Sequence, residues 1–152
     1  MLGDMCWYVV GMEEQLSFDD LMEIAEIALE APAEVLEETV CIFRANSALA
    51  APFVRVFGVD VFRDPVERAV ICALRLIRWR PFLAGNTEVA AWCMREMLLR
   101  SHYLWMQPDE DAEEMMNRLN RVDAGTMSFA ALLEWVRERV ELGTGLEDEP
   151  TA

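Results

Sequence analysis

Apolar residues recur every three or four positions along most of the chain, which is the period of an α-helix that buries one face. No stretch shows the sustained alternation with flanking hairpin turns that is typical of a β-sheet. Residues 5–10, MCWYVV, could form a short strand, but nothing obvious pairs with it. The expected fold class is all-α, with six helices over about 17–31, 34–50, 65–79, 86–103, 109–123 and 128–141.

The predicted helix ends coincide with residues that cap, start or stop helices. These residues are Ser17, Asp64, Pro65, Pro108, Gly125 and Ser128. Pro52 and Gly58 frame an irregular connection, and the spacing of Glu96 and Arg100 suits an ion pair on one helix face. We expect an N-terminal extension (1–16), a helical domain (17–141) and an acidic flexible tail (142–152).

Composition places the chain among globular proteins and adds a strong charge bias. Its 152 residues are 54% hydrophobic, enough for one domain with one core. The formal net charge is −15, and all 13 basic residues are arginine. Such a surface repels nucleic-acid phosphates and attracts a basic protein or peptide. Alternatively, the acidic excess serves solubility alone.

Membrane and export signals are weak. No apolar run reaches the roughly 18 residues that span a bilayer. The start, MLGDMCWYVVGMEE, carries Asp4 and no basic segment, so it is a poor signal peptide. We expect a cytoplasmic protein without a membrane partner.

Cysteine and histidine positions argue against a metal centre. The four cysteines form no C-x-x-C pair, and three lie in apolar helical stretches, which indicates buried, unreactive thiols. They are Cys6, Cys41, Cys72 and Cys93. His102 is the single histidine, so a histidine metal cluster is nearly excluded.

Four stretches, in this order, carry a family resemblance: SFDDLMEIAEIAL, NSALAAPFVRVFG, DPVERAVICALRLIRWRPFLAGN and PDEDAEEMMNRLNRVDAGTMSFAALLEWVRER. From about Ser17 to Val140 the chain resembles the Fic/Doc family, in particular its death-on-curing toxin branch. The resemblance implies a bundle of about six helices.

Members of that family transfer a nucleotidyl or phosphoryl group to a protein hydroxyl. Their signature loop, H-P-F-x-D/E-G-N-G/K-R, joins two helices. In it the His is the general base, the acid holds Mg²⁺, the following helix N-terminus binds phosphate and the Arg neutralises developing charge.

Residues 79–89, WRPFLAGNTEV, match that loop in shape but not in chemistry. The turn-forming residues are kept as Pro81, Phe82, Gly85 and Asn86. The base is replaced by Arg80, the metal-binding acid by Ala84, the Gly/Lys position by Thr87 and the clamping Arg by Glu88.

The three chemical replacements oppose the family reaction. Arg80 stays protonated and cannot accept a proton. Ala84 offers no oxygen to a metal, and Glu88 would repel a bound triphosphate by several kcal/mol in a partly dry site. His102 lies about 24 Å further along the same predicted helix, too far to replace the base. We expect no cofactor and no family-type transfer.

Three functions stay open. In the first, the protein is a catalytically degenerate binding or regulatory module that holds a basic protein or peptide. The predicted binding residues are Arg80, Pro81, Phe82, Gly85, Asn86, Thr87 and Glu88.

In the second, the scaffold carries out a non-nucleotide reaction, such as a lyase, cyclase or transfer step on a peptide or small molecule in a biosynthetic pathway. Arg80 would then anchor an anion and Glu88 would act as a base, although such a pair can also be a plain salt bridge.

In the third, the domain is a regulatory remnant that forms a homodimer or pairs with an active homologue. Its ten methionines and five tryptophans suit adaptable interfaces, although helical spacing also fits core packing. The residues expected to be exposed are Trp7, Trp79, Trp105 and Met106.

Overall fold

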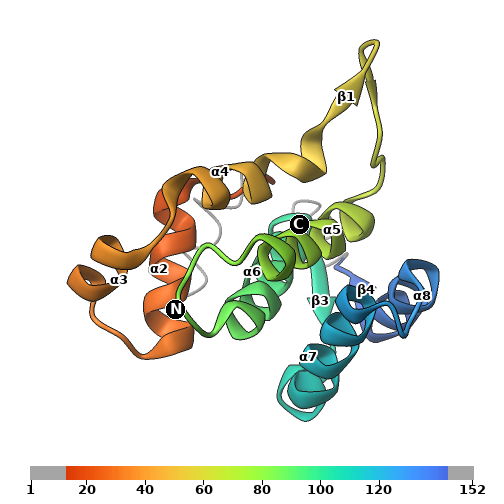
Figure 1. Ribbon diagram of the computed structural model, residues 1–152. Helices are drawn as coiled ribbons and strands as arrows, with labels where there is room; N and C mark the ends of the chain where they lie inside the picture. The colour runs from red at the N-terminus through yellow and green to blue at the C-terminus, as the bar shows by residue number, and fades with distance from the viewer. Residues whose placement is uncertain (1–12, 144–152) are drawn as a thin grey trace, which may run out of the picture.

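The computed structural model describes residues 13–143, and helices make up 68% of that range. It contains seven α-helices and two small two-stranded sheets, so the predicted all-α class is confirmed (Figure 1). The helices are α2 Phe18–Leu29, α3 Ala33–Thr39, α4 Ile42–Ala50, α5 Pro65–Trp79, α6 Asn86–Arg100, α7 Pro108–Ala124 and α8 Phe129–Arg139. The short elements are the 3₁₀ turn η1 Ala51–Phe53 and the strands β1 Arg55–Val56, β2 Val59–Asp60, β3 Tyr103–Trp105 and β4 Val140–Leu142.

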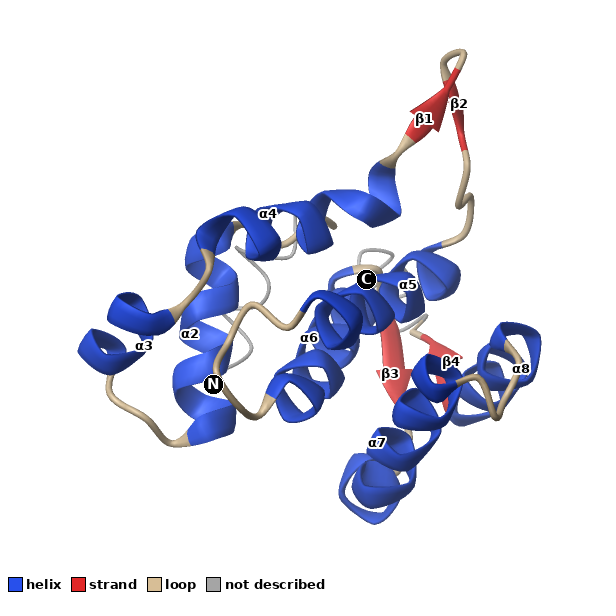
Figure 2. Cartoon of the chain, viewed as in Figure 1, coloured by secondary structure: helices blue, strands red, loops and turns tan. Residues whose placement is uncertain are grey.

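Helices α5 and α6 form the centre of the molecule. Each carries nine buried residues, and the two pack on each other. Helices α2 and α4 pack on one side of this pair, and α7 and α8 on the other (Figure 2). The loop that joins α5 to α6, residues 80–85, therefore connects the two central helices directly.

The capping residues act as the sequence predicts. Ser17 Oγ accepts a hydrogen bond from the Asp20 backbone N–H at 3.0 Å, and Asp20 Oδ2 accepts one from the Ser17 N–H at 2.9 Å. Ser128 caps α8 with one such bond, because its Oγ accepts from the Ala131 N–H at 3.0 Å. Gly125 ends α7 in a left-handed conformation, with φ 85°. These helix starts and stops are confirmed.

The prediction of one helix over 34–50 is wrong. Val40 and Cys41 are extended, which separates α3 from α4. The Cys41 N–H donates to the Pro81 carbonyl oxygen at 2.8 Å instead of continuing the helix. A contact with a residue forty positions away therefore breaks the local pattern.

The two predicted helices at 86–103 and 128–141 are each too long. Helix α6 ends at Arg100, and His102 turns the chain with φ 70°. Strands β3 and β4 then pair antiparallel, with Leu104 opposite Glu141. This pairing satisfies backbone groups that the predicted helix extensions would have used.

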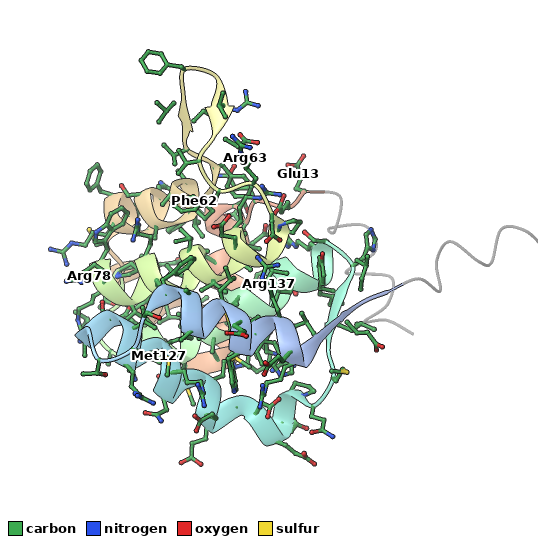
Figure 3. All side chains as sticks on the ribbon, turned by 90° about the vertical axis from the view of Figure 1, so that its right-hand side faces the viewer. Glu13, Phe62, Arg63, Arg78, Met127 and Arg137 are labelled. Atoms are coloured by element: carbon green, nitrogen blue, oxygen red, sulfur yellow. The ribbon has the colours of Figure 1, made fainter. Side chains whose placement is uncertain are left out.

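The irregular connection expected between Pro52 and Gly58 includes a regular hairpin. Strands β1 and β2 pair antiparallel, and the turn residues Phe57 and Gly58 have φ values of 52° and 77°. The hairpin projects from the helical body, and Phe62 and Arg63 lie where it returns (Figure 3). The sequence prediction missed it because only two residues pair on each strand.

The described part of the N-terminal segment, 13–16, packs against the helical domain. Leu16 is buried in the core, and Glu14 forms an ion pair with Arg68 at 2.7 Å. The strand suggested for 5–10 and the predicted tail beyond Gly143 lie outside the described residues. Across 13–143, no helix is long and apolar enough to cross a membrane.

Candidate functional site

The loop between α5 and α6 begins with a reversal of the chain at Arg80. Arg80 adopts a left-handed conformation (φ 51°, ψ 65°), and its N–H donates to the Leu76 carbonyl oxygen at 3.0 Å, which ends α5. The side chain is exposed. A non-glycine residue in this conformation is uncommon, so the turn is held by the residues that follow.

The turn is fixed by a buried side chain, that of Asn86. Asn86 Oδ1 accepts a hydrogen bond from the Phe82 N–H at 3.0 Å, and Asn86 Nδ2 donates to the Phe82 carbonyl oxygen at 2.9 Å. Asn86 is only 4% exposed, and so is Phe82. The Asn86 amide therefore pairs with the Phe82 backbone as a neighbouring β-strand would. Both its oxygen and its nitrogen have a hydrogen-bond partner.

Gly85 is required by both its conformation and its surroundings. It has φ 79°, and an added Cβ would lie 2.2 Å from Leu29 Cδ2 at the end of α2. The Pro81 carbonyl oxygen accepts from Cys41, so the loop also contacts the break between α3 and α4. The four turn-forming residues named from the sequence thus form one frame.

The chemically distinctive positions of the loop face outward. Ala84 and Glu88 are exposed, as is Arg80, and Leu83 is 77% exposed. Thr87 is half-buried, and its hydroxyl donates to Asn120 Oδ1 on α7 at 2.9 Å. The structure therefore separates the predicted residues into a buried frame and an exposed set.

Arg80 and Glu88, which the repurposed-enzyme hypothesis pairs, do not form an ion pair in the structure. Glu88 instead lies in the first turn of α6, where the helix dipole favours a carboxylate, and it lines a hollow with Trp92 and Arg95. The exposed guanidinium of Arg80 makes no ion pair among residues 13–143.

The loop lacks the groups that magnesium and a nucleotide require. Ala84 carries no oxygen ligand, and within residues 13–143 no group of three His, Cys, Asp or Glu side chains could hold a metal ion. Glu88 adds a negative charge to the first turn of α6, where a helix N-terminus would otherwise attract phosphate. The residues present do not fit the Mg²⁺–nucleotide pair that the Fic/Doc family uses.

The single histidine and the two buried cysteines lie away from the loop, whereas Cys41 contacts it through its backbone N–H. His102 is exposed at the far end of α6, about 22 Å along the helix from the loop, and just after the last helical turn instead of in it. Cys72 and Cys93 are fully buried; burial raises the pKa of Cys72 to about 12 and that of Cys93 well above its ordinary value. Cys41 is half-buried, and Cys6 lies outside the described residues. The buried thiols are therefore poor nucleophiles.

Sequence reasoning missed one exposed aromatic residue beside the loop. Trp92 is 42% exposed, whereas Trp79 and Trp105, both expected to be exposed, are half-buried. Met106 is exposed as expected, and Trp7 lies outside the described residues. A sequence signal for Trp92 was available in its spacing, because it lies four positions after Glu88 and four before Glu96, on the charged face of the helix.

Comparisons with family models, curated proteins and solved structures find no match for this chain. The Fic/Doc resemblance therefore depends on the quoted sequence stretches alone.

Proposed function

We propose that the protein is a non-catalytic binding module, related to the Fic/Doc family, that holds a basic protein or peptide. One observation carries the proposal: the loop keeps a buried, hydrogen-bonded frame, while its exposed positions carry none of the family's catalytic groups. Asn86 and Phe82 make the frame, and Arg80, Ala84 and Glu88 are what it presents. A hydrogen-bonded loop that lacks the family's base and metal-binding acid is suited to binding.

The exposed side chains argue against a transfer reaction. A general base must accept a proton, and the Arg80 guanidinium is already protonated at every accessible pH. Glu88 would meet the phosphates of a nucleotide with like charge. Removing these obstacles would take several substitutions at once.

The charge distribution supports a basic partner. Residues 13–39, which include α2 and α3, contain ten acids and no basic residue. Glu14 and Asp20 pair with Arg68 and Arg100, and the other eight are Glu13, Asp19, Glu23, Glu26, Glu30, Glu34, Glu37 and Glu38. A surface of one sign raises the encounter rate with an oppositely charged partner, and salt weakens that effect.

Titration calorimetry with ATP and Mg²⁺ tests the absence of family chemistry. We expect no measurable heat of binding from the wild-type chain. The matched variant Arg80→His/Ala84→Asp/Glu88→Arg restores the family's residues on the same turn, and it is expected to regain nucleotide binding. Micromolar binding of ATP by the wild type would overturn the non-catalytic assignment. A triple variant that binds no nucleotide would count against the Fic/Doc relation.

Fluorescence anisotropy with two defined peptides tests the basic partner. The probe is a labelled amphipathic peptide of leucine and lysine, about 18 residues long, and its control replaces every lysine with glutamate. We expect only the lysine peptide to bind, with affinity falling about tenfold between 50 and 300 mM salt. Equal binding, or none, would contradict the proposed partner class.

A further inference from the structure

A groove runs along α6 beside β3 and the start of α7. It consists of two adjoining hollows that share Trp92 and Arg95, and the larger has a volume of about 370 Å³. Helix α6 packs on both β3 and α7 (Figure 1) and contributes residues to both hollows. One end reaches Glu88, the last exposed residue of the candidate loop.

The floor of the groove is apolar and partly open to solvent. Trp92 is 42% exposed and Leu104 is 52% exposed, although both line the groove. Met115 and Met116 of α7 line the hollow next to Glu88. Exposed tryptophan beside methionine is typical of surfaces that bind a partner's apolar side chains.

The rim of the groove is acidic. Glu88 and Glu96 line it from α6. Glu96 also pairs with Arg100 at 3.0 Å, whereas the exposed Glu88 forms no ion pair among residues 13–143. Among the described residues that line the groove, Arg95 is the only base, and its guanidinium is already stacked over the Trp92 ring at 5.3 Å.

We infer that this groove is the docking site for a basic peptide segment that carries a large apolar residue between its lysines or arginines. The inference rests on the proposed function and assigns it a location: the apolar residue enters the larger hollow, between Trp92 and Leu104, and the flanking cations meet Glu88 and Glu96 at the rim. Charge complementarity selects this occupant. A second copy of the chain, which also has a net charge of −15, meets repulsion instead.

Affinity measurements on four variants test the location, with the leucine–lysine peptide as the probe. Trp92→Ala removes the apolar contact, and Phe43→Ala is its control, because Phe43 is 79% exposed on α4, which does not line the groove. Glu88→Arg reverses a rim charge, and Glu23→Arg reverses an exposed charge on α2. All four substituted positions are exposed, and circular dichroism checks that the fold is kept.

We expect Trp92→Ala to weaken peptide binding by about tenfold and Glu88→Arg by about fivefold, while each control changes it by less than about twofold. A photo-crosslinking residue in the peptide should attach to α6, β3 or α7. Equal losses from Glu88→Arg and Glu23→Arg, or crosslinks confined to α2 and α3, would overturn the groove and leave the basic partner standing. A probe that fails to bind the wild type would instead overturn the proposed function. The wild type could instead form a dimer that Trp92→Ala dissociates and that the peptide does not disrupt. That result would assign the groove to a second copy of the chain and overturn the inference.

Discussion

At the scale of single residues, the candidate loop depends on Asn86 and Gly85. The Asn86 amide makes two hydrogen bonds to the Phe82 backbone at a site that water does not reach. Leaving a buried backbone donor or acceptor without a partner costs about 1–3 kcal/mol. Asn86 and Gly85 therefore hold the turn whether or not the loop has any catalytic role.

Substituting alanine for Gly85 tests the frame directly. Gly125 is a matched control, because it has a similar left-handed φ of 85° but nothing within 4 Å of an added Cβ. We expect Gly125→Ala to cost roughly 1–2 kcal/mol for conformation alone, and Gly85→Ala about 1 kcal/mol more because its Cβ meets Leu29. Urea denaturation measures both changes.

The extra cost of Gly85→Ala should shrink when Leu29→Ala is combined with it, because the shorter side chain removes the collision. Equal losses of unfolding free energy in Gly85→Ala and Gly125→Ala, with no recovery in Gly85→Ala/Leu29→Ala, would contradict close packing of the loop on α2.

At the scale of elements, helix α6 is anchored to α2 by a buried arginine. The Arg100 side chain is 3% exposed and pairs with Glu96 at 3.0 Å, as the sequence spacing predicted, and with Asp20 at 3.2 Å. Its Nη1 also donates to the Glu13 carbonyl oxygen at 3.2 Å. One guanidinium thus joins the N-terminal segment, α2 and the C-terminal end of α6.

The contact between α2 and α6 should be sensitive to pH. Burial pushes the pKa of Asp20 upward, but hydrogen bonds from the Ser17 N–H and Arg100 outweigh it and lower the pKa below its ordinary 3.8. A lowered folded-state pKa contributes stability above pH 3.8 that is lost as the pH falls through the folded-state value. Asp20→Asn is therefore expected to cost about 1 kcal/mol at neutral pH and little in strong acid.

Asp19 provides the control for this prediction, because it is exposed in the same first turn of α2. Urea unfolding of Asp20→Asn, Asp19→Asn and the wild type is compared at neutral pH and well below pH 3.8. If the stability of Asp20→Asn stays below that of the wild type by the same amount at both pH values, the charged pair with Arg100 is not the cause.

At the scale of the whole molecule, other helices cover α5 and α6 on both sides. Reagents therefore reach the buried residues of this pair only when the protein unfolds. Cys72 on α5 and Cys93 on α6 are both fully buried. Their raised pKa values keep the thiols protonated, and the helices that cover them keep reagents out.

Thiol labelling of a Cys6→Ser/Cys41→Ser variant measures this opening. We expect Cys72 and Cys93 to react at least about a thousandfold more slowly in the native protein than in urea, since access requires unfolding of the central pair. The single variant Cys6→Ser, which keeps the half-buried Cys41, should show one faster thiol. Rapid native-state labelling of Cys93 would show that the centre opens locally.

Most helix positions could be predicted from the sequence, because a cap or a helical turn joins residues within four positions. The Ser17, Asp64 and Ser128 caps are of this kind. The errors occur where a distant residue decides: Pro81 breaks the helix predicted over 34–50, and Leu142 pairs with Tyr103 in a strand. Neither partner could be inferred from local periodicity.

The same distinction between local and distant contacts applies to the candidate site. The sequence by itself determined the all-α class, the charge of −15 and a loop that resembles the Fic/Doc motif but carries Arg80, Ala84 and Glu88 at its chemical positions. These properties depend on residue type and local spacing. Only the tertiary structure decided that Asn86 is buried, that Arg80 and Glu88 do not pair and that Trp92 opens onto a groove beside α7. Burial and groove walls arise from elements far apart in sequence, so the packed helices alone define them.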